Sequence, residues 1–174
     1  MSRERLETMS SRAANAVERC AVTSILADVL WALQRPDLGI GACLGFLQHM
    51  GVDLPMQPTD AQARAAYDRV CAKLGQRSIE ALADLPAMSD PAVRASMSVV
   101  ARLATSAMAM GKNYFSVVIL AGFELTLEHG NSDGASMIYA YAGIIIGWYF
   151  DDMQTALRLH RLALDRRKEQ APRK

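Results

Sequence analysis

Two carboxylates and two histidines are the residues of this sequence best suited to binding a metal ion or moving protons. Glu124, Glu128 and His129 lie close together in the chain, and His160 follows two predicted helices later. Metal sites in helical bundles typically use Glu-x-x-His pairs on facing helices. Glu128 and His129 are adjacent, so on a helix their side chains point apart and cannot form such a pair. The sequence therefore predicts neither a metal site nor a bound cofactor.

Catalytic motifs are also missing. Cys20, Cys43 and Cys71 are widely spaced without a CxxC pair, which predicts reduced core thiols in a cytosolic protein. Each serine lies outside a GxSxG elbow, and the HRD and DFG strings of protein kinases are absent. Gly111-Lys112 lacks the glycine five residues earlier that a phosphate-binding loop requires. We therefore expect this chain not to be an enzyme.

The remaining polar candidates have structural interpretations beside functional ones. His129 falls at a predicted helix end, where a cation interacts favourably with the helix dipole. His160 falls at a tight packing position, either as a hydrogen-bonded core histidine or as a lining residue of a groove. Glu124 is the one interior charge of an apolar helix, where a partner such as Lys112 would offset its desolvation. A small ligand-binding protein or enzyme with a pocket near Glu124 and His160 is the alternative function.

The elements that would position these residues are all helical. Of the 174 residues 51% are hydrophobic but only 6% aromatic, and Val, Ile and Thr do not alternate as strands require. Residues 3–14 predict a short polar helix or a frayed lead-in. Periodicity then predicts helices over 15–33, 38–50, 59–74, 77–85, 89–110, 114–128, 133–149 and 152–168. The helix at 114–128 is apolar on almost every side, which predicts burial all round.

Start and stop signals divide the helices. Asp90-Pro91 offers a capping side chain followed by proline in the first turn. The segment His129, Gly130 and Asn131 predicts a sharp structural corner, with Gly130 in the left-handed conformation that ends a helix.

The helices predict a single helical-repeat domain over 1–174. Short loops imply antiparallel pairs at 15–51, 91–129 and 131–168, and an irregular connection with short helices at 52–90. Gly39, Cys43, Phe46 and Leu47 share their spacing with the set Ala156, His160, Ala163 and Leu164. In both sets a small residue comes where the second helix of a pair must pass close to the first. We therefore expect an all-α, tetratricopeptide-like stack of about seven or eight antiparallel helices.

Charge and hydropathy narrow the class of partner. The net charge of +1 provides no field that would attract nucleic acid or an anionic membrane. The most apolar run, Met137–Phe150, is shorter than the roughly 20 residues that a membrane span needs. A cytoplasmic protein whose partners are other proteins or flanking domains is expected. Its oligomeric state is not determined by sequence.

One stretch offers a binding surface. Aromatic residues cluster on and after the helix at 133–149, and repeats of this kind present concave surfaces to partners. We expect Tyr139, Trp148 and His160 to line a partner groove, with core packing as the alternative for the aromatic side chains.

Four strings carry a resemblance to a known family. They are LQHMGVDLP at 47–55, LPAMSDP at 85–91, LTLEHGNS at 125–132 and FDDMQTA at 150–156. Together they resemble the tetratricopeptide-like helical region of large bacterial signalling proteins. Those proteins join a serine/threonine-kinase-like domain, an AAA-type ATPase domain, this helical region, a GAF domain and a histidine kinase or cyclase output. The resemblance covers about residues 15–168, and it departs at Asp151, where the family more often has glycine.

The resemblance implies a non-catalytic function. The ATP and phosphotransfer chemistry of such proteins belongs to domains whose motifs this chain lacks. The expected function is a protein-interaction and coupling module of a bacterial signal-transduction ATPase or kinase, associated with two-component signalling.

Overall fold

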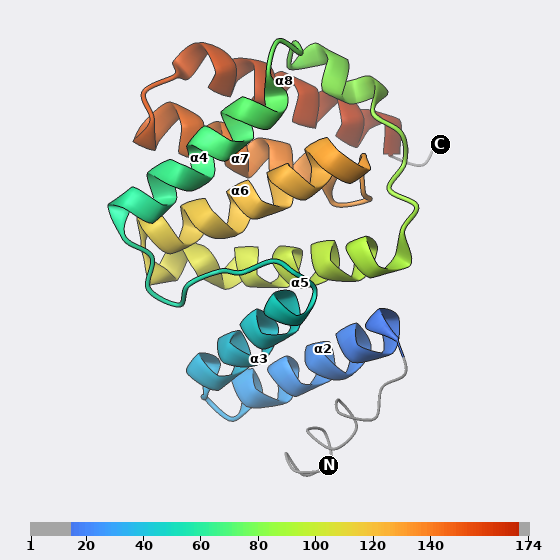
Figure 1. Ribbon diagram of the computed structural model, residues 1–174, viewed down its shortest axis with the longest axis vertical. Coiled ribbons are helices and arrows are strands. Elements are labelled where there is room, and N and C mark those ends of the chain that lie inside the picture. The colour runs from blue at the N-terminus through green and yellow to red at the C-terminus, as the bar shows by residue number, and fades with distance from the viewer. Residues whose placement is uncertain (1–14, 171–174) are drawn as a thin grey trace.

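The chain folds into helices joined by short turns (Figure 1). The computed structural model describes residues 15–170, so the polar helix predicted within 3–14 lies outside the described residues. The α-helices are α2 (Ala16–Ala32), α3 (Pro36–His49), α4 (Asp60–Leu74), α5 (Pro91–Ala107), α6 (Lys112–His129), α7 (Ala135–Tyr149) and α8 (Met153–Gln170). Two 3-10 helices, η1 (Glu80–Asp84) and η2 (Met108–Met110), lie between them. Between residues 15 and 170 there is no strand, so the all-α prediction is confirmed.

Local capping chemistry sets the helix starts. The Thr59 side chain accepts a hydrogen bond from the Gln62 N–H, and the Gln62 side chain bonds back to the Thr59 N–H, which forms a capping box for α4. Asp90 accepts from the N–H groups of Ala92 and Val93 at the start of α5. These starts agree with the sequence prediction because a capping side chain acts within its own turn.

The predicted helix over 77–85 is shorter than expected. Only the 3-10 helix Glu80–Asp84 forms there. The carbonyls of Leu82 and Leu85 accept hydrogen bonds from the side chain of Asn131, far along the sequence, and Pro86 follows. The backbone of this segment is therefore partly satisfied by another element and not by a continuing helix.

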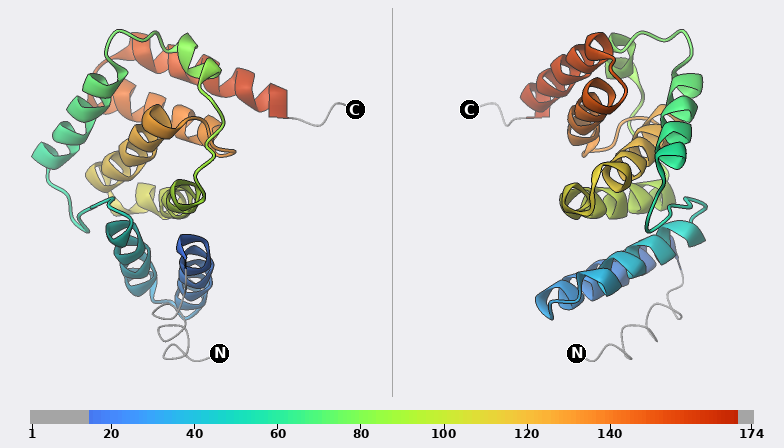
Figure 2. Two further views of the ribbon diagram at one scale, coloured as in Figure 1. Left: turned by 45° about the vertical axis from the view of Figure 1, so that its right-hand side comes forward. Right: turned by 90° about the vertical axis from the view of Figure 1, so that its left-hand side faces the viewer.

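Three helix pairs succeed one another along the long axis of the molecule (Figures 1 and 2). The pair α2–α3 lies at one end and packs against α5, the pair α5–α6 lies in the middle, and α8 lies at the other end against α7. Helix α6 contacts α4, α5 and α7, and its Ile119, Leu120 and Phe123 are fully buried. The predicted burial of this helix on all sides is confirmed.

Helix α4 changes the predicted arrangement. The region 52–90 was expected to be an irregular connection with short helices, and the helix predicted over 59–74 forms as α4, but it packs along α6 as a further layer. Its Arg69 and Lys73 form ion pairs with the carboxylates of Glu124 and Glu128 on α6. A succession of pairs alone therefore does not describe the molecule, because α6 is covered by an additional helix.

The turn between α7 and α8 holds Asp151 in an unusual backbone conformation. Asp151 has φ of +57°, the left-handed conformation that glycine adopts without steric cost. The next residue, Asp152, accepts a hydrogen bond from the Thr155 N–H at 3.0 Å and so caps α8. Hydrogen bonding from the Thr155 side chain, and then from its backbone N–H, holds the pKa of Asp152 below its usual range.

The two neighbouring aspartates should respond oppositely to substitution by glycine. Asp151→Gly relieves the strain of the left-handed backbone, but glycine also raises the conformational entropy of the unfolded chain. The net effect should be a rise of about 0.5 kcal/mol in the free energy of unfolding. Asp152→Gly removes the cap and should lower it by a few tenths of a kcal/mol. Urea denaturation of both variants measures the difference.

Because the folded pKa of Asp152 is depressed, the cap's stabilisation is present above the unfolded pKa of about 3.9 and is lost as the pH falls below it.

Helices α7 and α8 approach closely at small residues. A Cβ atom built on Gly147 would lie 3.0 Å from the Cβ of Ala156, and one on Gly143 would lie 2.6 Å from the ring of His160. Gly39 has the equivalent position in the first pair, where an added Cβ would lie 3.4 Å from the carbonyl oxygen of Ala27. The predicted small residue at the close approach of each pair is thus present.

Enlarging the residue at this approach should separate the last pair. Ala156→Phe places a ring against Gly147, where space is available for a methyl group only, and should lower the free energy of unfolding by about 3 kcal/mol. Leu157→Phe, at the neighbouring exposed position, is the matched control and should have almost no effect. Thermal and urea denaturation compare the two. Equal stability of the two variants would show that Ala156 does not lie at a tight contact.

Candidate functional site

The corner after α6 is a densely hydrogen-bonded feature of the molecule. The Asn131 N–H donates to the Pro86 carbonyl at 2.8 Å, and the Met88 N–H donates to the Asn131 carbonyl at 2.9 Å. The Asn131 side-chain amide donates to the carbonyl of Leu82 at 2.9 Å, and its oxygen accepts from the Tyr139 hydroxyl at 2.7 Å. We call this arrangement of residues 82–88 and 130–131 the clasp.

The clasp joins two of the four strings that carry the family resemblance. The LPAMSDP string provides Pro86 and Met88, and the LTLEHGNS string provides Gly130 and Asn131. Asn131 is 6% exposed, so its polar groups need these internal partners. These two strings therefore meet in a structural contact between distant segments of the chain.

Gly130 fits the corner for two reasons. Its φ of +95° confirms the predicted left-handed backbone, and an added Cβ would overlap the carbonyl oxygen of Pro86. The preceding His129 ends α6 with 40% of its side chain exposed and its Nε2 atom 3.8 Å from a carboxylate oxygen of Glu128. This placement suits the predicted interaction of His129 with the helix end.

The predicted groove of Tyr139, Trp148 and His160 does not form. Tyr139 is fully buried beside Phe123, and burial raises the pKa of Tyr139 to about 12. Trp148 is 77% exposed. The Nδ1 atom of His160 lies 2.8 Å from the carbonyl oxygen of Ala156, one turn back on its own helix. The core alternative is right for Tyr139, because the clasp supplies a partner for its hydroxyl.

Glu124 and His160 do not converge on one pocket either. Glu124, with 15% of its side chain exposed, faces α4 and pairs with Arg69 at 3.1 Å and Lys73 at 3.9 Å. The expected partner Lys112 instead pairs with Asp60 at 3.4 Å. His160 packs against Gly143 of α7. The two side chains therefore belong to different helix interfaces.

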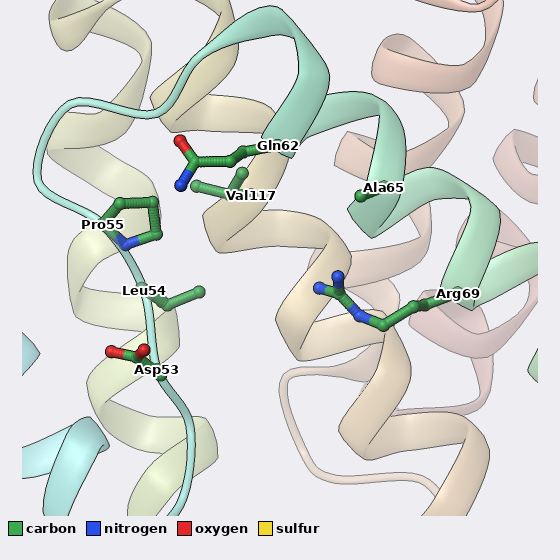
Figure 3. A pocket seen from close by; sticks show the side chains of 7 residues that line it. All are labelled: Asp53, Leu54, Pro55, Gln62, Ala65, Arg69 and Val117. Atoms are coloured by element: carbon green, nitrogen blue, oxygen red, sulfur yellow. The ribbon is translucent and has the colours of Figure 1, made fainter.

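A cleft runs between the extended segment 52–58 and helices α4 and α6 (Figure 3). Its volume is about 360 Å³, and its polar lining comes from Asp53, Gln62 and Arg69. Figure 3 shows these three side chains separated along the cleft. Gln62 is engaged in the α4 capping box and Arg69 in the pair with Glu124. The lining lacks a nucleophile–base pair.

A second cavity, of about 210 Å³, lies between α4 and the start of α8. Tyr67, Cys71, Asp152 and Thr155 are its polar lining, and its other residues are apolar or glycine. The Asp152 carboxylate already caps α8. Tyr67, one of the lining residues, stacks on Phe150 with ring centroids 4.1 Å apart. The cavity has an exposed cysteine in its lining but no histidine or glutamate that could activate the thiol.

Large apolar side chains are also exposed on α7 and α8. Four of them are Trp148, Met153, Leu157 and Leu164, which are exposed by 77%, 53%, 57% and 57%. The positions 153, 157 and 164 of α8 recur at helical spacing, so they form one stripe. Because α7 and α8 pack through Gly143, Gly147 and Ala156, this stripe runs beside the seam between the helices, away from the core. We call these four residues the α8 face.

The sequence contains a partial signal for this surface. Leu164 matches Leu47 in the repeat spacing, but Leu47 is fully buried in the main core and Leu164 is exposed. Leu157 lies next to Ala156 and so points away from the seam. A helical wheel of the predicted helix places residues 153, 157 and 164 in one stripe, whereas their exposure depends on which helices cover them.

The described residues carry neither a metal cluster nor a membrane-spanning helix. In the part of the chain that the structure describes, no group of three or more His, Cys, Asp or Glu side chains could hold a metal ion. Across residues 15–170, no helix combines the length and the apolar character that crossing a bilayer requires.

Comparisons with known proteins do not add a family assignment. No family model, curated protein or solved structure matches the chain.

Proposed function

We propose that this chain is a non-catalytic protein-interaction and coupling module of a bacterial signal-transduction ATPase or kinase, acting in the cytoplasm. The observation that carries the proposal is the α8 face. Four large apolar side chains of the last helix pair are exposed, three of them in one stripe of α8, and exposed apolar surface of this kind marks a site that another macromolecule covers. The family resemblance supplies the signalling context, with a tetratricopeptide-like stack as the corresponding architecture.

The alternative of a small ligand-binding protein or enzyme finds less support. Its two central residues, Glu124 and His160, lie in separate helix interfaces. The two cavities described above have polar linings whose groups are largely engaged in caps and ion pairs. An exposed apolar stripe suits protein docking better, since burying it removes apolar surface from water.

A coupling role follows from the order of contacts. A partner on the α8 face touches the last pair, α7 packs on α6, and α6 packs on α5 and α4. Displacement of α8 would therefore be passed to the other helices through packed side chains. The clasp holds α7 to the segment 82–88 and ties this chain of contacts together.

Site-specific cross-linking tests the proposal. A photoreactive amino acid replaces Leu157 in the chain, expressed in cells that naturally make it, and the matched control places it at Ala72, an exposed position on α4. We expect a protein cross-linked at position 157, absent at position 72, and lost when Trp148→Ser is added. Equal cross-linking at both positions would contradict a docking role for the α8 face.

A further inference from the structure

We infer that the α8 face binds the same face of a second copy of this chain, with the two α8 helices antiparallel. The inference rests on the proposed function, because it names the partner of that surface. It follows from three features: a position whose equivalent is covered in the first pair, the distribution of charge along α8, and the place of Trp148.

The first feature is that Leu164 lacks the covering helix that its equivalent residue in the first pair has. Leu47 and Leu164 have equivalent places in the repeat spacing, and both end a run of apolar residues on the second helix of a pair. Leu47 is fully buried in the main core, to which α5 also contributes, while Leu164 is 57% exposed. A helix lying on α8 as α5 lies on the first pair would bury Leu164. The α8 face is therefore suited to receive a helix.

The second feature is charge of opposite sign at the two ends of the stripe. Exposed Asp151 precedes Met153, and exposed Arg167 and Lys168 follow Leu164. Lys168 already pairs with Asp165 of its own helix at 3.1 Å, so Arg167 is the cation offered to a second copy. In an antiparallel arrangement centred near residue 159, Asp151 of one copy lies opposite Arg167 of the other. The same register places Met153 beside Leu164 of the second copy, so the apolar and charged positions match together.

Symmetry makes this match occur twice. A two-fold axis through the centre of the stripe brings both acidic ends to both basic ends. Antiparallel α8 helices also set each positive N-terminus beside a negative C-terminus. The net charge of +1 per chain gives little overall repulsion between copies. A parallel arrangement would instead place like charges together.

The third feature is Trp148. It lies at the end of α7 beside the start of α8 and is the most exposed large hydrophobic residue among those described. In the antiparallel register its indole lies toward the Leu164 end of the second copy's α8. Large aromatic side chains that become buried in a contact often carry much of the binding energy. Each copy contributes one such anchor.

Sedimentation analysis of the full chain provides the test. We expect a concentration-dependent species of twice the 19.0 kDa chain mass. Leu157→Asp places a charge on the stripe and should raise the dimer dissociation constant by roughly tenfold or more, as expected for a central contact. Leu33→Asp, at a position 65% exposed at the opposite end of the molecule, is the matched control and should leave it unchanged. Circular dichroism melting of both variants confirms that they fold.

Charge reversal tests the register. Arg167→Glu should raise the dissociation constant by about three- to tenfold, because the new carboxylate would face the carboxylate of Asp151 in the other copy. Asp151→Lys combined with Arg167→Glu should restore most of the lost affinity, since the two charges are then exchanged. Failure of the double variant to recover would overturn the antiparallel register.

The outcomes separate this inference from the proposed function. A chain that stays monomeric over about a hundredfold range of concentration overturns the second-copy inference. If position 157 then still cross-links another protein, the docking role of the face stands and its partner is a different chain. A dimer whose dissociation constant is unchanged by Leu157→Asp overturns the inference as well, because it must use another surface.

Discussion

Replacing Gly130 by alanine should lower the free energy of unfolding by about 3 to 4 kcal/mol, because backbone strain and a steric overlap act together. The backbone at this position has φ of +95° and ψ of −175°, a region that is essentially restricted to glycine. The strain alone costs about 1 to 3 kcal/mol. The added methyl group also overlaps the Pro86 carbonyl oxygen, which accepts the hydrogen bond from the Asn131 N–H. Relief of the overlap must therefore open the clasp, and urea denaturation at equilibrium measures the loss.

Gly51→Ala is the matched control for this variant. Gly51 also has a positive φ, +82°, but an added Cβ there would meet no atom within 4 Å. The Gly51→Ala variant should lose only the free energy of unfolding that comes from backbone strain, about 1 to 2 kcal/mol. If Gly130→Ala and Gly51→Ala lower the free energy of unfolding equally, the overlap with Pro86 contributes nothing and the clasp is looser than the structure indicates.

Replacing Asn131 by leucine should have an effect of similar size, about 3 to 5 kcal/mol, because several buried polar groups lose their partner at once. The side-chain amide of Asn131 donates to the carbonyls of Leu82 and Leu85 and accepts from the Tyr139 hydroxyl. Leucine has nearly the same size, so the expected loss comes from hydrogen bonding and not from a cavity. Chemical denaturation followed by circular dichroism gives the free energy.

Two tyrosines provide the controls. Tyr139→Phe removes one hydrogen bond of the clasp and should cost about 1 kcal/mol. Tyr114 is also buried, but its hydroxyl has no hydrogen-bond partner among the described residues, and burial raises its pKa. Tyr114→Phe should therefore be neutral or stabilising. A double-mutant cycle of Asn131→Leu with Tyr139→Phe should show coupling, since the two residues share a bond.

Helix positions were largely predictable because their signals are local. The Thr59 and Asp90 caps act within one turn, and the apolar character of the helix predicted over 114–128 is visible without knowing its neighbours. The segment 77–85 was less predictable, because the carbonyls of Leu82 and Leu85 accept hydrogen bonds from Asn131, which lies 49 and 46 positions further along the chain. Local propensity cannot report a hydrogen bond made to a distant residue.

The candidate site was predicted only in part. Sequence singled out the corner at His129, Gly130 and Asn131, and the structure shows why glycine and asparagine occur there. It also singled out Trp148, but grouped it with Tyr139 and His160. Both of these residues face inward or along a helix seam, because the side on which each aromatic ring lies depends on the packing of α7 against α6 and α8.

The sequence by itself determined the helices, the left-handed glycine at the corner and the small residues at the close approaches, because each follows from backbone sterics or helical periodicity. Tertiary structure alone decided that the LPAMSDP and LTLEHGNS strings meet in one clasp and that α4 covers α6. It also decided that Leu164 is exposed where its equivalent Leu47 is buried. An apolar residue has the same chemistry in both places. Only the presence or absence of a covering helix separates the buried position from the exposed one.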